Sequence, residues 1–333
     1  MTASTGVTSR VPLVDLSGAF EPGPRRDEVV DEIRRACEDV GFLVITGHGV
    51  STEDIGRIDG AARRFFDLPQ DDKMDLVCEV GNRRGYKPLQ SSTLALSRDK
   101  ETPPDLAELY LVNRFDDREA ARRAGLREGR EEFFAPNVWP DSDMVPGFRE
   151  SFLAYYAVME DLAARIMGLM ALALNLDEHW FDDKIADHVT GLAALRYPAL
   201  DAAPLPGQFR RGPHSDWGSL TILYSDGVPG LQILSPEGEW EDVPAIAGSF
   251  VINIGDLMAA WTNDRWVSTL HRVVVADGAW GERISVAFFH QPTYDARIEC
   301  IPTCTSPDDS PRYEPITSGE WLDLMIRKTT TYN

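Results

Sequence analysis

The spacing of hydrophobic residues along this chain changes near residue 191. Before that point apolar side chains recur mainly at helical intervals, first over residues 28–40, where Gly41 is a natural helix terminator. The longest helical signal covers residues 147–176 and places seven large or apolar residues along one side: Phe152, Tyr155, Met159, Leu162, Ile166, Leu169 and Ala173. We expect this segment to be a scaffold helix that lies against a β core.

After residue 191 the pattern becomes that of short strands separated by turns. The strand candidates cover residues 192–197, 219–225, 231–234, 240–245, 249–254, 268–276 and 283–291. Seven or eight short strands with turns between them are typical of a sandwich or a barrel-like roll. The sequence therefore predicts a mostly β core with flanking helices.

Both ends of the chain add further elements to this core. Near the N-terminus we expect strands at 11–16 and 42–45, the helix at 28–40 and a second helix that Ser51 caps, with Asp54 three residues later. Residues 79–146 are irregular, polar and rich in turn formers. At the other end, residues 312–333 predict an amphipathic helix through Trp321 and Leu324, either a lid over the mouth of the roll or plain packing.

The charge and cysteine content exclude several classes of protein. A formal net charge of −21 argues against nucleic acids and anionic membranes as partners, because phosphate binding needs clustered Lys and Arg. The four cysteines show no disulfide spacing, and no run of eighteen apolar residues occurs. We therefore expect a cytoplasmic protein whose partner is a small molecule, and the sequence predicts no oligomeric state.

The chemistry is concentrated in the stretch Gly212–Gly218, GPHSDWG. His214 and Asp216 are two residues apart beside a strand-like run, so we expect their side chains to share one face. His271 lies in another β-rich run that can reach the same place. A bare H-x-D is common, but two imidazoles and one carboxylate on one face of a metal are typical of non-haem Fe(II) oxygenases.

A second group of residues follows twelve positions later. Alternation along a strand places Arg283 and Ser285 on one face and Ile284 on the other. A guanidinium fork beside a hydroxyl suits a carboxylate, since it offers two parallel charge-assisted hydrogen bonds. A metal triad followed by a carboxylate clamp is a specific combination.

At these residues the chain resembles the isopenicillin N synthase-like family of Fe(II)- and 2-oxoglutarate-dependent dioxygenases. The match covers nearly the whole chain through VPLVDL, GFLVITGHGV, FFDLPQDDKM, PHSDWGSLTIL, GLQ at 230–232, NIGDLM at 253–258, TNDRWVSTLHRV at 262–273 and RIS followed by FFHQP. The resemblance implies a non-haem dioxygenase N-terminal region at 10–125 and a double-stranded β-helix, or jelly roll, at 190–297.

The resemblance also implies the site and the reaction. Iron would be held by His214, Asp216 and His271, and the distal carboxylate of 2-oxoglutarate by Arg283 and Ser285, while Tyr197 matches a tyrosine that often touches this co-substrate. With O2, a small organic molecule would be hydroxylated, desaturated or cyclised, with release of succinate and CO2. Bacterial members of this family often serve specialised-metabolite pathways such as antibiotic biosynthesis.

Candidate substrate contacts lie around these groups. Arg84 and Tyr86 flank a glycine at which relatives often touch substrate, although a solvated Arg and a packing Tyr are equally consistent with the sequence. Trp217 follows the metal carboxylate, and Leu231 and Phe289 lie on nearby strands. His290 fits a core or rim residue better than a functional one.

Other functions stay open at this stage. An Fe(II) oxidase without a 2-oxo acid is possible, because relatives of the isopenicillin N synthase type use the same Arg and Ser for a substrate carboxylate. An inactive metal-binding module is more remote, since the clamp residues are intact. A zinc hydrolase would need a further Glu or His as general base, and no motif supplies one.

Overall fold

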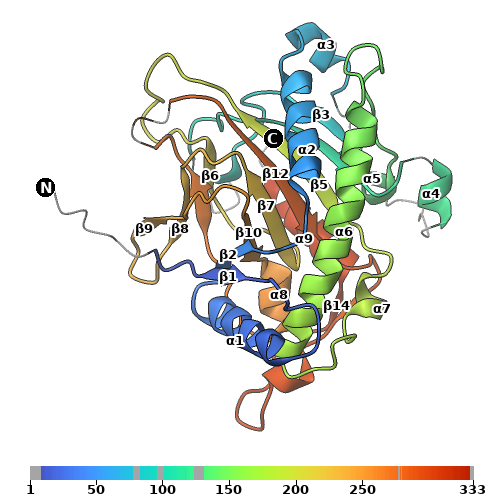
Figure 1. Ribbon diagram of the computed structural model, residues 1–333, viewed down its shortest axis with the longest axis vertical. Coiled ribbons are helices and arrows are strands. Elements are labelled where there is room, and N and C mark those ends of the chain that lie inside the picture. The colour runs from blue at the N-terminus through green and yellow to red at the C-terminus, as the bar shows by residue number, and fades with distance from the viewer. Residues whose placement is uncertain are drawn as a thin grey trace, which may run out of the picture.

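The computed structural model describes residues 9–77, 83–95, 101–116, 118–123, 131–276, 278 and 280–330. These residues form three layers: helices, a large sheet and a small sheet (Figure 1). In the described part of the chain, no helix is both long and apolar enough to cross a membrane.

The large sheet joins strands from both halves of the chain. Its order is β1-β2-β10-β7-β12-β5-β4-β3. The strands are β1 (Leu13–Asp15), β2 (Phe42–Thr46), β3 (Gly85–Lys87), β4 (Glu108–Asn113), β5 (Gly191–Tyr197), β7 (Leu220–Ser225), β10 (Phe250–Ile254) and β12 (Arg283–His290). The N-terminal strands therefore extend both edges of a sheet whose centre comes from the C-terminal half.

The small sheet has the order β6-β11-β8-β9 and faces one side of the large sheet. It contains β6 (Arg211–His214), β8 (Leu231–Leu234), β9 (Trp240–Asp242) and β11 (His271–Val273). A separate two-stranded ribbon joins β13 (Arg297–Ile298) to β14 (Ile316–Thr317). Two facing sheets with crossed connections form the jelly roll that the sequence predicts, so the expected fold class is confirmed.

Helices cover the opposite side of the large sheet. The longest is α6 (Phe148–Ala173), and α1 (Pro24–Asp39) and α2 (Thr52–Phe66) pack beside it (Figure 1). Ser51 caps α2 by accepting a hydrogen bond from the Asp54 amide. The other helices are α3 (Gln70–Met74), α4 (Arg118–Arg123), α5 (Glu131–Phe134), α7 (Asp182–Ile185), α8 (Asp256–Trp261), α9 (Ser318–Thr330) and the 3₁₀ turn η2 (Pro302–Cys304).

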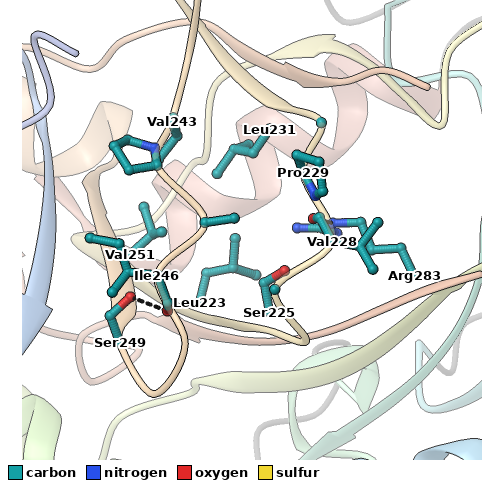
Figure 2. A pocket seen from close by; sticks show the side chains of 14 residues that line it. Leu223, Ser225, Val228, Pro229, Leu231, Val243, Ile246, Ser249, Val251 and Arg283 are labelled. Atoms are coloured by element: carbon teal, nitrogen blue, oxygen red, sulfur yellow. Dashed lines mark hydrogen bonds between the residues drawn. The ribbon is translucent and has the colours of Figure 1, made fainter. Parts of the chain in front are cut away.

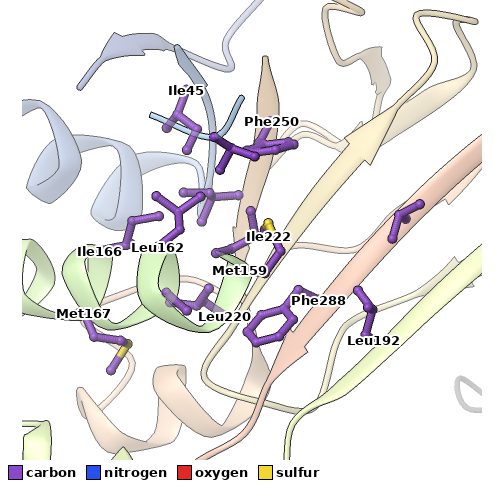
Figure 3. Close-up of a cluster of buried hydrophobic side chains, with 14 of the residues drawn as sticks. Ile45, Met159, Leu162, Ile166, Met167, Leu192, Leu220, Ile222, Phe250 and Phe288 are labelled. Carbon is purple, nitrogen blue, oxygen red and sulfur yellow. The ribbon is translucent and has the colours of Figure 1, made fainter. Parts of the chain in front are cut away.

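A hydrophobic core fills the space between α6 and the large sheet. Met159, Leu162 and Ile166 of α6 point toward alternate residues of the strands, among them Ile222 and Phe288 (Figure 3). These side chains are at most 1% exposed, and burying each contributes roughly 1.5–3 kcal/mol. The packed helix fixes the strands that carry the site.

The period-two pattern gives the large sheet a second, inner face toward the small sheet. On β12, Ile284 belongs to the helix-side core, whereas Ala287 belongs to an inner cluster that also contains Tyr197, Leu231 and Val273. Arg283 and Ser285 alternate with Ile284 and therefore point to the same face of β12 as Ala287. Both are 1% exposed. The predicted alternation along this strand is confirmed, and the clamp residues lie inside the roll.

The C-terminal helix α9 docks against the loop that follows β6. Trp321 donates from Nε1 to the backbone oxygen of Trp217 at 3.0 Å. At the start of α9, a Cβ on Gly319 would lie 2.4 Å from the Tyr294 ring, so the helix backbone rests directly on that ring. The helix therefore covers the protein beside Trp217.

Candidate active site

His214 and His271 are cross-strand partners on β6 and β11. Their ring centroids are 4.2 Å apart. The Nε2 atom of each lies 3.9 Å from Oδ1 of Asp216. The three possible ligand atoms lie within 4.8 Å of one another, so one metal ion can touch all three.

Both imidazoles are oriented by backbone carbonyls. Nδ1 of His214 lies 2.8 Å from the Gly212 oxygen, and Nδ1 of His271 lies 3.2 Å from the Thr269 oxygen. A proton on Nδ1 satisfies each carbonyl and leaves the Nε2 lone pair directed at the triad centre. Burial, followed by the charge of His271, lowers the pKa of His214 to about 3, which keeps its ring neutral as a metal ligand must be.

Asp216 reaches the triad in a different way from the one the sequence suggests. The two side chains do meet, as expected, but strand β6 ends at His214, so strand alternation is not what aligns them. Instead, Oδ2 of Asp216 accepts hydrogen bonds from Thr221 at 2.5 Å and from Asn253 at 2.8 Å, and Oδ1 is left for the metal. Burial raises the pKa of Asp216, but the neighbouring His271 and His214 imidazoles and these two hydrogen bonds outweigh it, so the pKa is lowered and the carboxyl group is ionised.

Two glycines allow the Asp216 loop to approach the start of α8. A Cβ on Gly255 would lie 2.2 Å from the oxygen of Gly218, and one on Gly218 would lie 2.4 Å from the oxygen of His290. The Asp256 amide donates to the backbone oxygen of Asp216 at 2.8 Å. The position of the carboxylate thus depends on a contact that side chains at these glycines would prevent.

The donor set of the triad suits Fe(II). It consists of two neutral imidazole nitrogens and one carboxylate oxygen on one side of a common centre, the facial arrangement that leaves further coordination positions open. Among the described residues, this triad is the group of three His, Cys, Asp or Glu side chains that lie close enough together to hold one metal ion.

A narrow pocket inside the roll ends at Arg283 (Figure 2). The guanidinium donates from Nε to the Val228 oxygen at 3.2 Å and lies 5.1 Å from the Tyr197 ring centroid. Its Nη1 atom, like Oγ of Ser285, is buried and has no hydrogen-bond partner in the part of the chain that the structure describes. The apolar wall includes Leu223 and Leu231. Orphaned donors at the end of an apolar pocket are the features that a bound carboxylate would satisfy.

The register of β7 and β12 relates this clamp to the metal triad. Ser285 lies opposite Ser225, and Phe289 lies opposite Thr221, which holds Asp216. Four residue steps along the strand separate Ser225 from Thr221, about 13 Å at the usual rise. The side chains of the clamp and of the triad both extend into the interior, so the distance between their polar atoms is shorter than the distance along the strand. A short extended molecule can therefore bridge Arg283 and the metal.

Three of the proposed substrate contacts lie on or beside this interior. Trp217 is half-buried next to Asp216, with the Arg83 guanidinium 6.0 Å from its ring centroid. Phe289 is half-buried and packs against the inner cluster near Thr221. Leu231 is buried and lines the pocket that ends at Arg283, so it lies at the clamp.

The other two proposed contacts have different surroundings. Arg84 is buried and donates to the Phe133 oxygen at 3.3 Å, and Phe133 packs against Tyr294 below α9. Tyr86 is fully buried in the helix-side core, where its hydroxyl donates to Glu108 and Lys73 lies 5.4 Å from its ring centroid. Tyr86 therefore belongs to the helix-side core and does not face the interior of the roll.

His290 points away from the inner face of the roll. Its Nδ1 atom lies 2.6 Å from Oγ of Ser219, and it is 2% exposed. Burial, followed by the charge of His188, lowers its pKa to about 3. The environment is that of a neutral core residue.

Thr221 and Asn253 are the functional residues that sequence reasoning did not identify. Asn253 carries a usable signal, because it is the polar member of an otherwise apolar buried strand, FVINI. Thr221 carries none, since threonine is ordinary in a strand.

Comparison with known proteins gives matches over most of the chain. Residues 11–142 match the family model described as non-haem dioxygenase in morphine synthesis N-terminal, and residues 190–292 match that of the 2OG-Fe(II) oxygenase superfamily.

Individual relatives align over nearly their full lengths. A 2-oxoglutarate-Fe(II) type oxidoreductase of Emericella nidulans is 35% identical over 325 residues, covering 95% of this chain and 88% of the relative. Kihadalactone A synthase of Citrus sinensis is 30% identical over 341 residues, covering 98% and 95%. The crystal structure of a full-length Neurospora crassa protein in complex with alpha-KG and thymine superposes with a TM-score of 0.83 at 28% identity, covering 97% of each chain.

Proposed function

Because this chain belongs to the isopenicillin N synthase-like 2-oxoglutarate–Fe(II) oxygenases, and is thus a 2-oxoglutarate-dependent dioxygenase, we propose the roles of its residues as follows. His214, Asp216 and His271 hold Fe(II). Arg283, Ser285 and Tyr197 form the site for the distal carboxylate of 2-oxoglutarate. The substrate is a small organic molecule that enters beside Trp217.

One observation supports the co-substrate site above all others. Nη1 of Arg283 and Oγ of Ser285 are buried inside the roll with no hydrogen-bond partner among the described residues. An unsatisfied buried donor costs roughly 1–3 kcal/mol, more when it is charged, so a ligand that supplies an anionic acceptor is strongly favoured there. The carboxylate of a 2-oxo dicarboxylic acid is such an acceptor.

The bound iron and 2-oxoglutarate supply the oxidising chemistry: O2 is consumed as 2-oxoglutarate is decarboxylated to succinate and CO2. The chain contributes orientation. Thr221 and Asn253 fix Oδ2 of Asp216, the carbonyls of Gly212 and Thr269 fix the imidazoles, and Arg283 fixes the far end of the co-substrate. The apolar wall around Leu231 excludes water from the space between.

On the substrate side we propose Trp217, Phe289 and Arg84 as contacts, with Leu231 nearer to the co-substrate. Trp217 lies beside the proposed metal ligand Asp216, and Phe289 lies opposite Thr221, which holds Asp216. The names of relatives, a kihadalactone A synthase and a structure with thymine, favour small organic substrates, and we propose a role in specialised metabolism. Hydroxylation, desaturation and cyclisation are all compatible with this site.

We also propose that the protein acts in the cytoplasm and binds neither nucleic acid nor membrane. Cys37, Cys300 and Cys304 are unpaired, as in a reducing compartment, and the fourth cysteine lies outside the described residues. The net charge of −21 disfavours polyanionic partners.

The test is an anaerobic titration. Metal-free protein receives Fe(II) and then 2-oxoglutarate, and the visible charge-transfer band of the chelated 2-oxo acid is recorded for the wild type and for Arg283→Ala. We expect a band in the wild type and a much weaker one in the variant at equal concentrations. Iron bound one per chain without any band would mean that Arg283 and Ser285 hold a carboxylate of the substrate itself.

A further inference from the structure

A second buried arginine, Arg210, has donors that the protein leaves unused. Its side chain is 0% exposed, and Nη2 donates to the Gly281 oxygen at 2.5 Å. Its Nε and Nη1 atoms are buried, and no described residue offers them a hydrogen-bond acceptor. Within the described residues, neither Arg210 nor Arg283 has a carboxylate oxygen within 4.0 Å of its guanidinium.

Arg210 approaches Arg283 and Ser285 of the large sheet from the small sheet. Arg210 directly precedes β6 of the small sheet, whereas Gly281 lies two residues before Arg283 of the large sheet. The side chain therefore spans from one sheet to the other at the Arg283 end of the roll. Burial lowers the pKa of Arg210, and the charge of Arg283 lowers it further, while Tyr197 and Asp226 act in the opposite direction.

Two buried guanidiniums that repel each other, as Arg210 and Arg283 do, destabilise a fold when they have no counter-ion. The nearby carboxylate, Asp226, is already engaged: its Oδ2 accepts from Arg63 at 2.9 Å and from the Ile284 amide at 2.8 Å. Ser285 and Ser225, opposite each other on β12 and β7, add two hydroxyls that have no hydrogen-bond partner among the residues described by the structure. This end of the interior is thus built to receive negative charge from outside the chain.

We propose that Arg210 is a second arginine of the 2-oxoglutarate site, facing the distal carboxylate from the small sheet while Arg283 and Ser285 face it from the large sheet. This inference rests on the proposed function. It has a consequence for selectivity. A 2-oxo acid with a distal carboxylate gains binding affinity from both arginines, whereas a 2-oxo acid without a distal carboxylate gains affinity from neither. Removing Arg210 therefore reduces the preference for the dicarboxylate.

The experiment uses anaerobic Fe(II)-loaded protein and two probes, 2-oxoglutarate and the monocarboxylate 2-oxobutyrate, each titrated by its charge-transfer band. In Arg210→Met we expect at least a tenfold weaker affinity for 2-oxoglutarate, about 1.4 kcal/mol, and a change of less than twofold for 2-oxobutyrate. Arg272→Met is the matched control, because Arg272 is a half-buried arginine of the same small sheet that stacks on Trp240 at 4.0 Å. It should leave both affinities within twofold of the wild type.

Thermal unfolding of the metal-free, ligand-free proteins separates binding from structural support. Arg210→Met should unfold at the same temperature as the wild type or a higher one, since it removes an unpaired buried cation. If the Met variant does not fold, Arg210→Gln is titrated with the same expectations. Unchanged 2-oxoglutarate affinity, an equal loss for both probes, or a lower unfolding temperature in the absence of ligands would overturn the inference. A wild type without any band would instead contradict the proposed function.

Discussion

Thr221 and Asn253 stand opposite each other on β7 and β10, and both donate a hydrogen bond to the same oxygen of Asp216. The pair holds Oδ2 and leaves Oδ1 directed at His214 and His271. A metal ligand that lies in a loop thereby acquires the rigidity of the large sheet. Hydrogen-bonding partners of this kind typically contribute 10- to 100-fold to metal affinity.

We therefore expect Thr221→Val to weaken Fe(II) binding about tenfold or more, because valine keeps the shape of threonine and removes the donor. Thr221→Ser, which keeps the hydroxyl, should bind Fe(II) within about twofold of the wild type. Anaerobic competition with a metal-binding dye measures both. Equal affinities in the Val and Ser variants would show that the Thr221 hydroxyl does not position Asp216.

Removing the hydroxyl of Ser285 should affect binding and stability in opposite ways. A hydrogen bond to a carboxylate contributes about 1.5–3 kcal/mol, so Ser285→Ala should bind 2-oxoglutarate roughly 10- to 100-fold more weakly. Because the hydroxyl is buried and none of the described residues pairs with it, the ligand-free variant should be as stable as the wild type or slightly more stable.

Ser249 provides the control for this prediction. It lines the pocket that ends at Arg283, and its hydroxyl donates to the Ile246 oxygen at 2.8 Å (Figure 2). Ser249→Ala should lose about 1 kcal/mol of stability and keep its affinity for 2-oxoglutarate. Chemical denaturation and the anaerobic titration together distinguish the two serines, and the same behaviour in both variants would contradict the assignment of Ser285.

The hydrogen bond from Trp321 to the Trp217 backbone should control how often α9 separates from the metal loop. Trp321→Phe removes it, at a cost of about 1 kcal/mol, so amide hydrogen exchange across α9 should accelerate about fivefold. Trp280→Phe is the control, because Trp280 is 41% exposed. Unchanged exchange in Trp321→Phe would mean that other contacts hold the helix.

His290 should make the fold sensitive to acid. Its pKa is about 3 in the folded protein and 6.5 ordinarily, so the unfolded chain binds the extra proton between these values. The contribution of the neutral ring to the unfolding free energy is complete above pH 6.5. It declines as the pH falls toward 3, by up to about 1.4 kcal/mol per pH unit. His290→Gln should flatten the dependence of the unfolding free energy on pH in this window.

His179, which is exposed and pairs with Asp182, supplies the comparison. His179→Gln should retain the wild-type dependence on pH, as measured by urea denaturation at several pH values. A His290→Gln profile that matches the wild type would refute the assignment of the buried neutral ring.

Gly255→Ala should damage the metal site from outside it. The new methyl group would meet the Gly218 oxygen at 2.2 Å, so the loop that carries Asp216 must move. We expect a loss of about 1–3 kcal/mol of stability and a measurable loss of Fe(II) affinity. Gly56→Ala, on α2 with nothing within 4 Å, should instead be neutral or stabilising. Fe(II) affinity equal to the wild type in Gly255→Ala would show that the loop adapts.

The sequence allowed prediction of those features that depend on local periodicity. Alternation along β12 is enough to place Arg283 and Ser285 on one face, and the apolar stripe of residues 147–176 is enough to predict α6. Local periodicity could not predict the position of a side chain that is held by residues far away in the sequence. Asp216 lies in a loop that Asn253 holds, and Tyr86 is drawn into a core that α2 supplies.

Arg210 illustrates the same limit. In sequence it is one of two adjacent arginines, and only its burial beside Gly281 distinguishes it from Arg211. The predicted division of the chain at residues 10–125, 147–176, 190–297 and 312–333 stays a prediction, and strands from the first and third of these segments share one sheet.

That shared sheet has a consequence for how the protein folds. Strand β2 pairs with β10, and beside this pair His48 meets the Gly248 carbonyl across 200 residues of chain. Contacts between such distant residues require the closure of a very large loop before they contribute any stability, which slows folding. During synthesis, the edge of β2 that pairs with β10 stays unpaired until most of the chain has left the ribosome. Aggregation of this intermediate, more than the stability of the folded protein, should therefore limit the yield of soluble enzyme.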